Sequence, residues 1–278
     1  GKKNMTIKLI ATDMDGTFVD EKGTYDRLRF ERLLKEMQAR GIHFVAASGN
    51  SMPRLYRIFE GFEKEVTFVA ENGARLVEKG VTLIHQTMPR SELNALLAYF
   101  SDKLVAYRAV VSGLSNSYRL KEANFHYRPG LIEPKEFEVF ISHILPVDDF
   151  SQIPADEPVS KLTMMIPEDH ERIAADFNQN YPGNLVAVGS GYGAIDFIQE
   201  GIHKAWGIRQ LMDRYGLKAD QVMTFGDGGN DIEMLELTPH SYAVANASIP
   251  VQAAARHLIG HHKDGAVMTT LEEWLGLD

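Results

Sequence analysis

The sequence predicts an α/β protein, in which a doubly wound, Rossmann-like parallel-sheet domain is interrupted by an inserted α+β domain. Apolar strand patterns alternate with helical patterns along residues 1–86 and again along residues 190–278. Between them, in residues 87–189, prolines punctuate a different order of elements. Polar motifs follow three of the predicted strands, where doubly wound sheets bind their ligands. We therefore expect a catalytic core of residues 1–86 and 190–278 and a cap of residues 87–189.

The elements can be justified in chain order. Short apolar runs predict strands, and apolar residues at helical spacing predict helices, with Ser51 and Pro53 marking a helix start and Gly41 a helix end. Residues 66–86 predict a strand, an Asn72-Gly73 turn and a hairpin that turns near Lys79-Gly80. The expected strands are 7–12, 42–48, 104–111, 160–166, 184–190, 221–228 and 241–246. The expected helices are 25–40, 51–62, 91–103, 134–144, 168–181, 203–216, 231–238, 247–259 and 266–276.

Composition excludes several classes of function. The chain has 278 residues, a net charge of -9 and no cysteine, so disulfides, thiolate metal sites and a cysteine nucleophile are absent. The acidic balance disfavours nucleic acid and anionic membranes as partners. No apolar run approaches the roughly 18 residues of a membrane span. Lack of cysteine fits a reducing compartment, and we expect a cytoplasmic protein.

Asp13 and Asp15 follow the first predicted strand and are separated by one residue. Residues two apart share a face of a strand, and the Gly16-Thr17 turn can bring both carboxylates toward one point. Carboxylates this close raise each other's pKa unless a cation lies between them. Mg²⁺ suits the pair, because it takes oxygen ligands and accepts substrate phosphate into its shell. A capped Asp-Gly turn is the alternative explanation.

A second acidic motif, GDGGND at residues 226–231, follows a later predicted strand. Asp227 can complete the shell of the same metal ion, and Asp231 can serve as a more distant ligand or orient the others. Asn230 can hydrogen-bond the ligand. The alternative is a tight loop in which Asp231 favours the positive start of a helix.

Ser48, Gly49 and Lys204 offer hydrogen-bond donors to an anion. The Ser48 hydroxyl and the Gly49 backbone N–H follow the second predicted strand and suit phosphoryl oxygens. Lys204 begins a predicted helix, where the positive end of the helix disfavours a cation unless an anion lies there too. Taken singly, an ordinary Ser-Gly turn and an exposed lysine would explain these residues.

Together and in this order, DMDGT at 13–17, SGN at 48–50, Lys204 and GDGGND resemble the motifs of the haloacid dehalogenase-like phosphatases. The strings ATDMDGTF, ASGN and FVAENGA are similar to the bacterial sugar phosphatases of the Cof-type branch. The insert resembles the large cap of that branch in length and order of elements. Many relatives have TGR where this chain has SGN, so Ser48 keeps the hydroxyl while Asn50 replaces a cation.

The resemblance implies a role for each matching residue. Asp13 corresponds to the nucleophile that becomes an aspartyl phosphate, and Asp15 to the general acid/base. The residues expected at the substrate are Ser48, Gly49, Lys204 and Asn230. The residues expected at Mg²⁺ are Asp13, Asp15 through its main-chain carbonyl, Asp227 and Asp231.

We therefore expect a Mg²⁺-dependent phosphatase of small phosphorylated metabolites, with sugar phosphates as the first candidates. A phosphosugar mutase or a phosphatase of another metabolite, such as a vitamin phosphate, would share the aspartate pair. A non-catalytic signalling module phosphorylated on aspartate is a candidate from another class, although such modules are shorter and lack the insert. Candidate pocket residues of the cap are Tyr107, Arg108, Asn116, Tyr118 and Arg128.

Overall fold

The computed structural model describes residues 6–125, 134–191 and 193–277. They divide into two compact units, Gly1–Ile84 with His203–Asp278, the core unit, and His85–Ile202, the inserted unit. The sequence prediction put residues 190–202 in the core. Strand β11 (Ala194–Gln199) instead pairs antiparallel with β9 and β10 in the sheet of the inserted unit. Its place follows from the tight turn at Gly193, which lets it fold back on the strand just before it.

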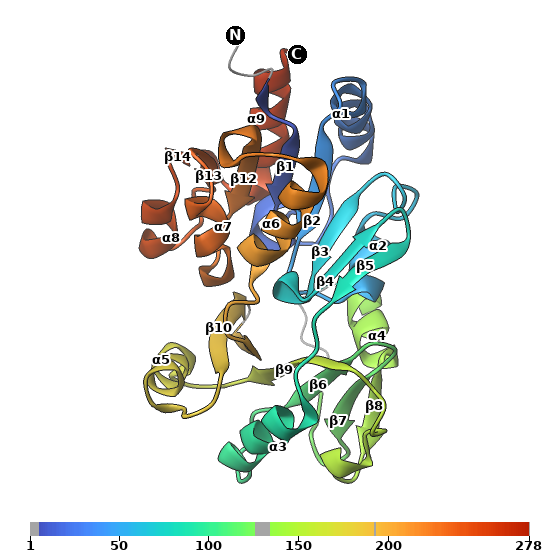
Figure 1. Cartoon of the computed structure of the whole chain (residues 1–278), viewed down its shortest axis with the longest axis vertical. Coiled ribbons are helices and arrows are strands. Elements are labelled where there is room, and N and C mark those ends of the chain that lie inside the picture. The colour runs from blue at the N-terminus through green and yellow to red at the C-terminus, as the bar shows by residue number, and fades with distance from the viewer. Residues whose placement is uncertain (1–5, 126–133, 192, 278) are drawn as a thin grey trace. The chain divides into compact units, whose positions relative to one another are not determined.

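The core unit is built on one mixed sheet with the strand order β14-β13-β12-β1-β2-β3-β4-β5 (Figure 1). Its strands from β14 to β3 run parallel, and β4 is antiparallel to β3. The predicted hairpin at Lys79-Gly80 joins β4 to β5. The strand bounds are β1 (Leu9–Thr12), β2 (His43–Ala47), β3 (Thr67–Ala70), β4 (Arg75–Glu78), β5 (Val81–His85), β12 (Val222–Gly226), β13 (His240–Ala243) and β14 (His257–Leu258).

Helices cover both faces of this sheet, because its central strands are apolar on both sides. Ile10 and Phe44 point into one cluster with α1 (Arg27–Ala39), α2 (Met52–Ile58) and α9 (Ala266–Leu275). The intervening residues, such as Leu9 and Val45, point into a second cluster. That second cluster includes α6 (Lys204–Tyr215) and α7 (Ile232–Glu236), and α8 (Ile249–Ala254) packs against α7. The doubly wound core that the sequence predicted is therefore confirmed.

The inserted unit is an α+β unit with its own sheet and its own core. Its strands lie in the order β10-β11-β9-β6-β7-β8, and its largest cluster holds Phe100, Leu162, Phe177 and Phe197. The remaining strand bounds are β6 (Val110–Gly113), β7 (Ser117–Leu120), β8 (Ile144–Val147), β9 (Val159–Met165) and β10 (Leu185–Gly191). The helices are α3 (Arg90–Tyr99), α4 (Pro134–Ser142) and α5 (His170–Asn180).

Two sequence expectations for the inserted unit need correction. The strand expected at residues 104–111 begins only at Val110, because the preceding residues form turns in which the Tyr107 N–H donates to the Lys103 carbonyl oxygen. Strands β7 and β8 were not predicted from their short sequences.

Arg128, a candidate pocket residue, lies outside the described residues. Among the helices that the structure describes, none combines the length and apolar character that a membrane crossing requires.

The structure makes a direct prediction about the core of the first unit. Phe30 on α1 is fully buried among Phe18, Phe44 and Phe59, so Phe30→Ala should lower the free energy of unfolding by about 3–5 kcal/mol. Tryptophan fluorescence during urea unfolding reports this unit selectively, because Trp206 and Trp274 both belong to it.

Leu28 provides the matched control, since it lies on the same helix with 79% of its surface exposed. Leu28→Ala should change the free energy of unfolding by no more than about 0.5 kcal/mol. Equal losses in the two variants would contradict the packing described here.

Candidate active site

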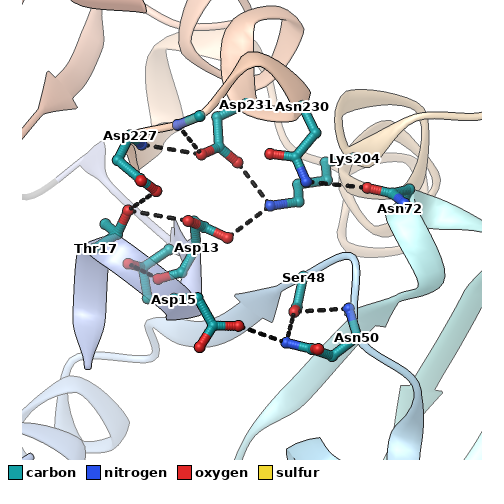
Figure 2. Close-up of polar contacts among 12 residues, drawn as sticks. Asp13, Asp15, Thr17, Ser48, Asn50, Asn72, Lys204, Asp227, Asn230 and Asp231 are labelled. Atoms are coloured by element: carbon teal, nitrogen blue, oxygen red, sulfur yellow. Dashed lines mark hydrogen bonds and ion pairs between the residues drawn. The ribbon is translucent and has the colours of Figure 1, made fainter. Parts of the chain in front are cut away.

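The predicted site residues meet at the carboxyl end of the core sheet (Figure 2). Strands β12, β1, β2 and β3 are neighbours and run parallel, so the loops that follow them emerge side by side. The loops carry Asp13 to Thr17, Ser48 to Asn50, Glu71 to Gly73, and Asp227 to Asp231. Lys204, the first residue of α6, reaches the same point.

The turn after β1 positions both of the first two aspartates. Phe18 N–H donates to the Asp13 carbonyl oxygen at 3.2 Å, which closes one wide turn over residues 14–18. Inside it Gly16 is left-handed, with φ 78°. A Cβ at Gly16 would lie 2.3 Å from Oδ2 of Asp227, so only glycine fits. The Asn246 side-chain amide donates to the Gly16 carbonyl oxygen at 2.8 Å and holds the turn from outside.

Lys204 connects two buried carboxylates. Its Nζ lies 2.7 Å from Oδ1 of Asp13 and 2.7 Å from Oδ1 of Asp231, and its side chain is 0% exposed. Burial by itself lowers the pKa of the ammonium, but the two adjacent carboxylates outweigh it and raise the pKa above its ordinary value. Lys204 therefore stays charged, and the carboxylates of Asp13 and Asp231 supply negative charge at this helix start.

Thr17 and Asp231 organise the remaining carboxylates. The Thr17 hydroxyl lies 3.0 Å from Oδ2 of Asp13 and 2.8 Å from Oδ1 of Asp227. Oδ2 of Asp231 accepts hydrogen bonds from the backbone N–H groups of Asp227 and Gly228, at 3.0 Å each. Because Oδ1 of Asp231 already accepts from Lys204, this residue is well suited to orienting the loop and the lysine.

The acidic cluster fits a divalent cation. Asp13, Asp227 and Asp231 each offer an oxygen within 4.8 Å of the others. Three carboxylates face one ammonium, and the single Thr17 hydrogen can serve only one of its two acceptors at a time. Burial raises the pKa of all three carboxyl groups, that of Asp231 to about 6, although Lys204 lowers each of them. Such a cluster of oxygen ligands with excess negative charge suits Mg²⁺.

The Asp15 side chain lies apart from this cluster and pairs with an arginine. Arg54, on the first turn of α2, places its two terminal nitrogens 2.5 and 2.7 Å from the two Asp15 oxygens. The Asn50 amide donates to Oδ2 of Asp15 at 2.8 Å. Burial raises the pKa of Asp15, but the ion pair with Arg54 outweighs it, and the pKa is lowered. The two aspartates are therefore separated in pKa, Asp13 raised and Asp15 lowered.

Arg54 was missed by the sequence analysis, although a signal was available. The argument applied to Lys204 holds for it equally, because a cation in the first turn of a helix is disfavoured unless an anion lies nearby. Arg54 also supplies the positive charge that the sequence analysis found absent at Asn50. Sequence spacing alone does not point to it, since it lies four residues beyond the SGN motif.

Ser48 is buried at the end of β2 with its hydroxyl hydrogen still available. Its Oγ accepts from the Asn50 backbone N–H at 2.9 Å and from the Asn50 side-chain amide at 2.8 Å. Because both contacts use the oxygen as acceptor, the hydroxyl can donate to a ligand. Gly49 lies beside it, partly exposed at the same strand end.

Asn230 is held by a residue that was predicted only as part of a turn. Its amide Nδ2 lies 3.2 Å from Oδ1 of Asn72, as Figure 2 shows. Asn72 is buried and left-handed, with φ 57°, a conformation that asparagine tolerates better than most residues. The next residue, Gly73, could not be larger, because a Cβ there would lie 2.1 Å from the His203 carbonyl oxygen. The loop after β3 thus fixes both Asn230 and the start of α6.

Comparison with known proteins identifies relatives along nearly the whole chain. The sequence profile described as haloacid dehalogenase-like hydrolase matches residues 10–271. The 5-amino-6-(5-phospho-D-ribitylamino)uracil phosphatase YbjI of Escherichia coli strain K12 is 32% identical over 272 residues, which cover 98% of this chain and 97% of that protein. A phosphoglycolate phosphatase of Metallosphaera sedula is 27% identical over 251 residues, 90% of each chain.

Solved structures agree with this relationship. SMU.1108c from Streptococcus mutans UA159 superposes with a TM-score of 0.87 at 35% identity, over 97% of this chain and 99% of that one. The subclass IIB sugar phosphatase BT4131 superposes with a TM-score of 0.77 over 96% and 98% of the two chains. At 21% identity, that second likeness is evidence of a shared fold alone. The family resemblance noted in the sequence is confirmed.

The buried Asp231 predicts a pH dependence of stability. Its pKa is raised from 3.8 to about 6, so between these values the folded protein holds a proton that the unfolded chain has released. Stability from this group is therefore present below pH 4 and is lost as pH rises to about 6, on the order of 3 kcal/mol. Urea unfolding in EDTA at several pH values measures it.

Asp231→Asn should lack this decline in the free energy of unfolding, since an amide does not titrate. Asp220→Asn removes an exposed aspartate as the control and should follow the native curve. If the free energy of unfolding changed with pH in the same way for all three proteins between pH 4 and 6, Asp231 would not have the buried, charged surroundings described here.

Proposed function

The chain belongs to the haloacid dehalogenase-like hydrolases and is a phosphoric monoester hydrolase; from this premise we propose that it is a Mg²⁺-dependent phosphatase of sugar phosphates. The observation that carries the proposal is the buried Asp13, paired with Lys204, with a second aspartate two residues along the chain. The proposed reaction proceeds through an aspartyl phosphate on Asp13.

The first step transfers the phosphoryl group to Asp13. Lys204, Ser48 and the Gly49 N–H bind phosphoryl oxygens and so offset the repulsion between the carboxylate and the substrate dianion. An oxygen of Asp13 attacks phosphorus in line, and the bond from phosphorus to the ester oxygen breaks. Asp15 donates a proton to the departing alkoxide. Holding Asp13 ready for attack supplies part of the roughly 7–11 kcal/mol available from proximity.

The second step returns the enzyme to its starting state. Asp15, deprotonated by the first step, takes a proton from a water molecule that attacks the aspartyl phosphate. The bond from phosphorus to Asp13 breaks, and inorganic phosphate leaves. Asp15 thus serves as acid and then as base. Its pKa without substrate is lowered, which suits the second role, and the negative charge of a bound phosphate would raise that pKa and favour the first.

The acidic cluster is the proposed Mg²⁺ site. Asp13, Asp227 and the main-chain carbonyl of Asp15 would hold the ion, with Asp231 close by as a ligand or as the residue that orients them. When bound, Mg²⁺ supplies positive charge that keeps Asp13 ionised and neutralises the phosphate. The raised pKa of Asp13 without the ion supports this assignment, because a nucleophile must be ionised to attack.

Two observations bear on the substrate. YbjI is named for a substrate that carries its phosphate on a ribityl chain, and BT4131 is named a sugar phosphatase. Both names describe a phosphate ester of a carbon chain that bears further hydroxyl groups, so a phosphorylated sugar or sugar alcohol is the proposed class. We assign the choice among these to the inserted unit, which is the predicted cap. Membership in the family excludes the signalling module.

A phosphosugar mutase, the alternative weighed from the sequence, would give a different result in a turnover assay. A mutase would return the phosphoryl group to a sugar, would need a bisphosphate activator and would release little inorganic phosphate. The discriminating experiment measures phosphate release with Mg²⁺ across sugar phosphates, sugar alcohol phosphates, nucleotides and vitamin phosphates. A phosphatase of the proposed class releases phosphate steadily from the first two groups without a bisphosphate.

Two substitutions should remove this activity. Asp13→Asn lacks the nucleophile and Asp15→Asn lacks the proton carrier, so each should lower kcat at least about 100-fold. Removing Mg²⁺ with EDTA should lower the kcat of the native protein to a similar extent. Full phosphate release by Asp13→Asn would reject the assignment of the nucleophile.

Gly16 gives a test of the geometry itself. Gly16 and Gly80 both have φ 78°, so alanine strains the backbone equally at either position, by about 1–2 kcal/mol. Only at Gly16 would the new methyl group displace Asp227, because no atom lies within 4 Å of a Cβ at Gly80. Gly16→Ala should therefore raise the Mg²⁺ concentration for half-maximal activity and cut kcat at least about 10-fold.

Gly80→Ala should keep native kcat and Mg²⁺ dependence while losing similar stability. If Gly16→Ala behaves like Gly80→Ala in the activity assay, the close approach of Gly16 to Asp227 does not matter to the reaction.

A further inference from the structure

Arg54 and Asp15 form an ion pair separate from the two that Lys204 makes, and the proposed reaction does not yet use the arginine. The Arg54 guanidinium contacts both oxygens of one carboxylate, which fixes the plane of that carboxylate as well as its position. Both side chains are largely buried, with 21% and 18% exposed. Asn50 adds a third donor, so Asp15 receives three hydrogen bonds from elements outside its own turn.

The position of Asp15 would be undetermined without these contacts. Its turn is held at the backbone, through Gly16 and Phe18, but its side chain has rotatable bonds beyond that anchor. Lys204 is a second cation whose charge acts favourably on Asp15. A carboxylate released by Arg54 would be drawn by Lys204 but repelled by the carboxylates around it, so the cluster around Lys204 would not hold it in one place. Figure 2 shows it instead pointing toward Asn50, away from that cluster.

We propose that Arg54 is a positioning residue, which holds the Asp15 carboxylate where it can exchange protons with the leaving group and with water. The inference deepens the proposed function and rests on it. Arginine is required because its planar fork meets both oxygens at once, whereas a lysine would supply a single point of charge. Arg54 has no contact with the phosphoryl group in this role and acts through Asp15.

The role can be separated from simple structural damage by dividing the reaction into its two steps. With p-nitrophenyl phosphate the leaving group departs as a stable anion, so transfer to Asp13 needs no proton from Asp15. Attack of water on the aspartyl phosphate still needs Asp15 to take a proton. In single turnover, nitrophenolate release reports the first step and phosphate release the second.

Arg54→Gln should change the rate of nitrophenolate release less than about 3-fold and slow phosphate release at least about 10-fold. Arg54→Lys should show the same asymmetry with a smaller loss, which keeps the test valid if the glutamine variant does not fold. Asp15→Asn should reproduce the asymmetry, and Asp15→Asn with Arg54→Gln should be no slower than Asp15→Asn alone, because one residue acts through the other.

Arg40→Gln is the matched control, since Arg40 also pairs with a carboxylate, Glu36 at 2.8 Å, but at the end of α1, before β2 begins. It should leave both steps unchanged. Equal slowing of both steps by Arg54→Gln, additive losses in the double variant, or no slowing at all would each overturn the positioning role. A native protein that released phosphate neither from p-nitrophenyl phosphate nor from sugar phosphates would instead reject the proposed function.

Discussion

The buried ammonium of Lys204 is the constraint on which the site depends. A charge taken out of water is costly unless close partners replace the lost hydration, and here Asp13 and Asp231 do so at 2.7 Å each. Those contacts oblige three separate loops to meet at one point. Gly16 shows how closely two of these loops meet, because a Cβ there would lie 2.3 Å from Oδ2 of Asp227. Removing any partner would leave an uncompensated buried charge.

The same arrangement explains how two neighbouring aspartates acquire different roles. Asp13 lies inside the cluster, where burial and Asp227 raise its pKa against the effect of Lys204. Asp15, only two residues away, faces Arg54 and has a lowered pKa. The left-handed Gly16 lies in the same turn and makes room for Asp227. Within the proposed mechanism, a metal ion then supplies the positive charge that the cluster lacks.

The core fold and most of the site could be predicted from the sequence, because they depend on local patterns. Apolar runs ending in polar motifs identified β1, β2 and β12, and the resemblance to a known family, more than its place at a helix start, identified Lys204. The site features that the sequence did not predict depend on contacts between distant segments. The partner of Asp15 is set by how α2 packs, and the support of Asn230 by a left-handed Asn72. The residues of β11 were assigned to the core without a predicted strand, because the pairing partner of a strand cannot be read from its own residues.

The most direct test of the account is to find where the phosphoryl group resides during turnover. Protein that is quenched in acid during substrate hydrolysis can be digested, and the masses of its peptides can be measured by mass spectrometry. We predict added phosphate on the peptide that contains Asp13, and loss of that phosphate on treatment with hydroxylamine, as expected for an acyl phosphate. Phosphate on a different residue, or none on any peptide while turnover continues, would contradict it.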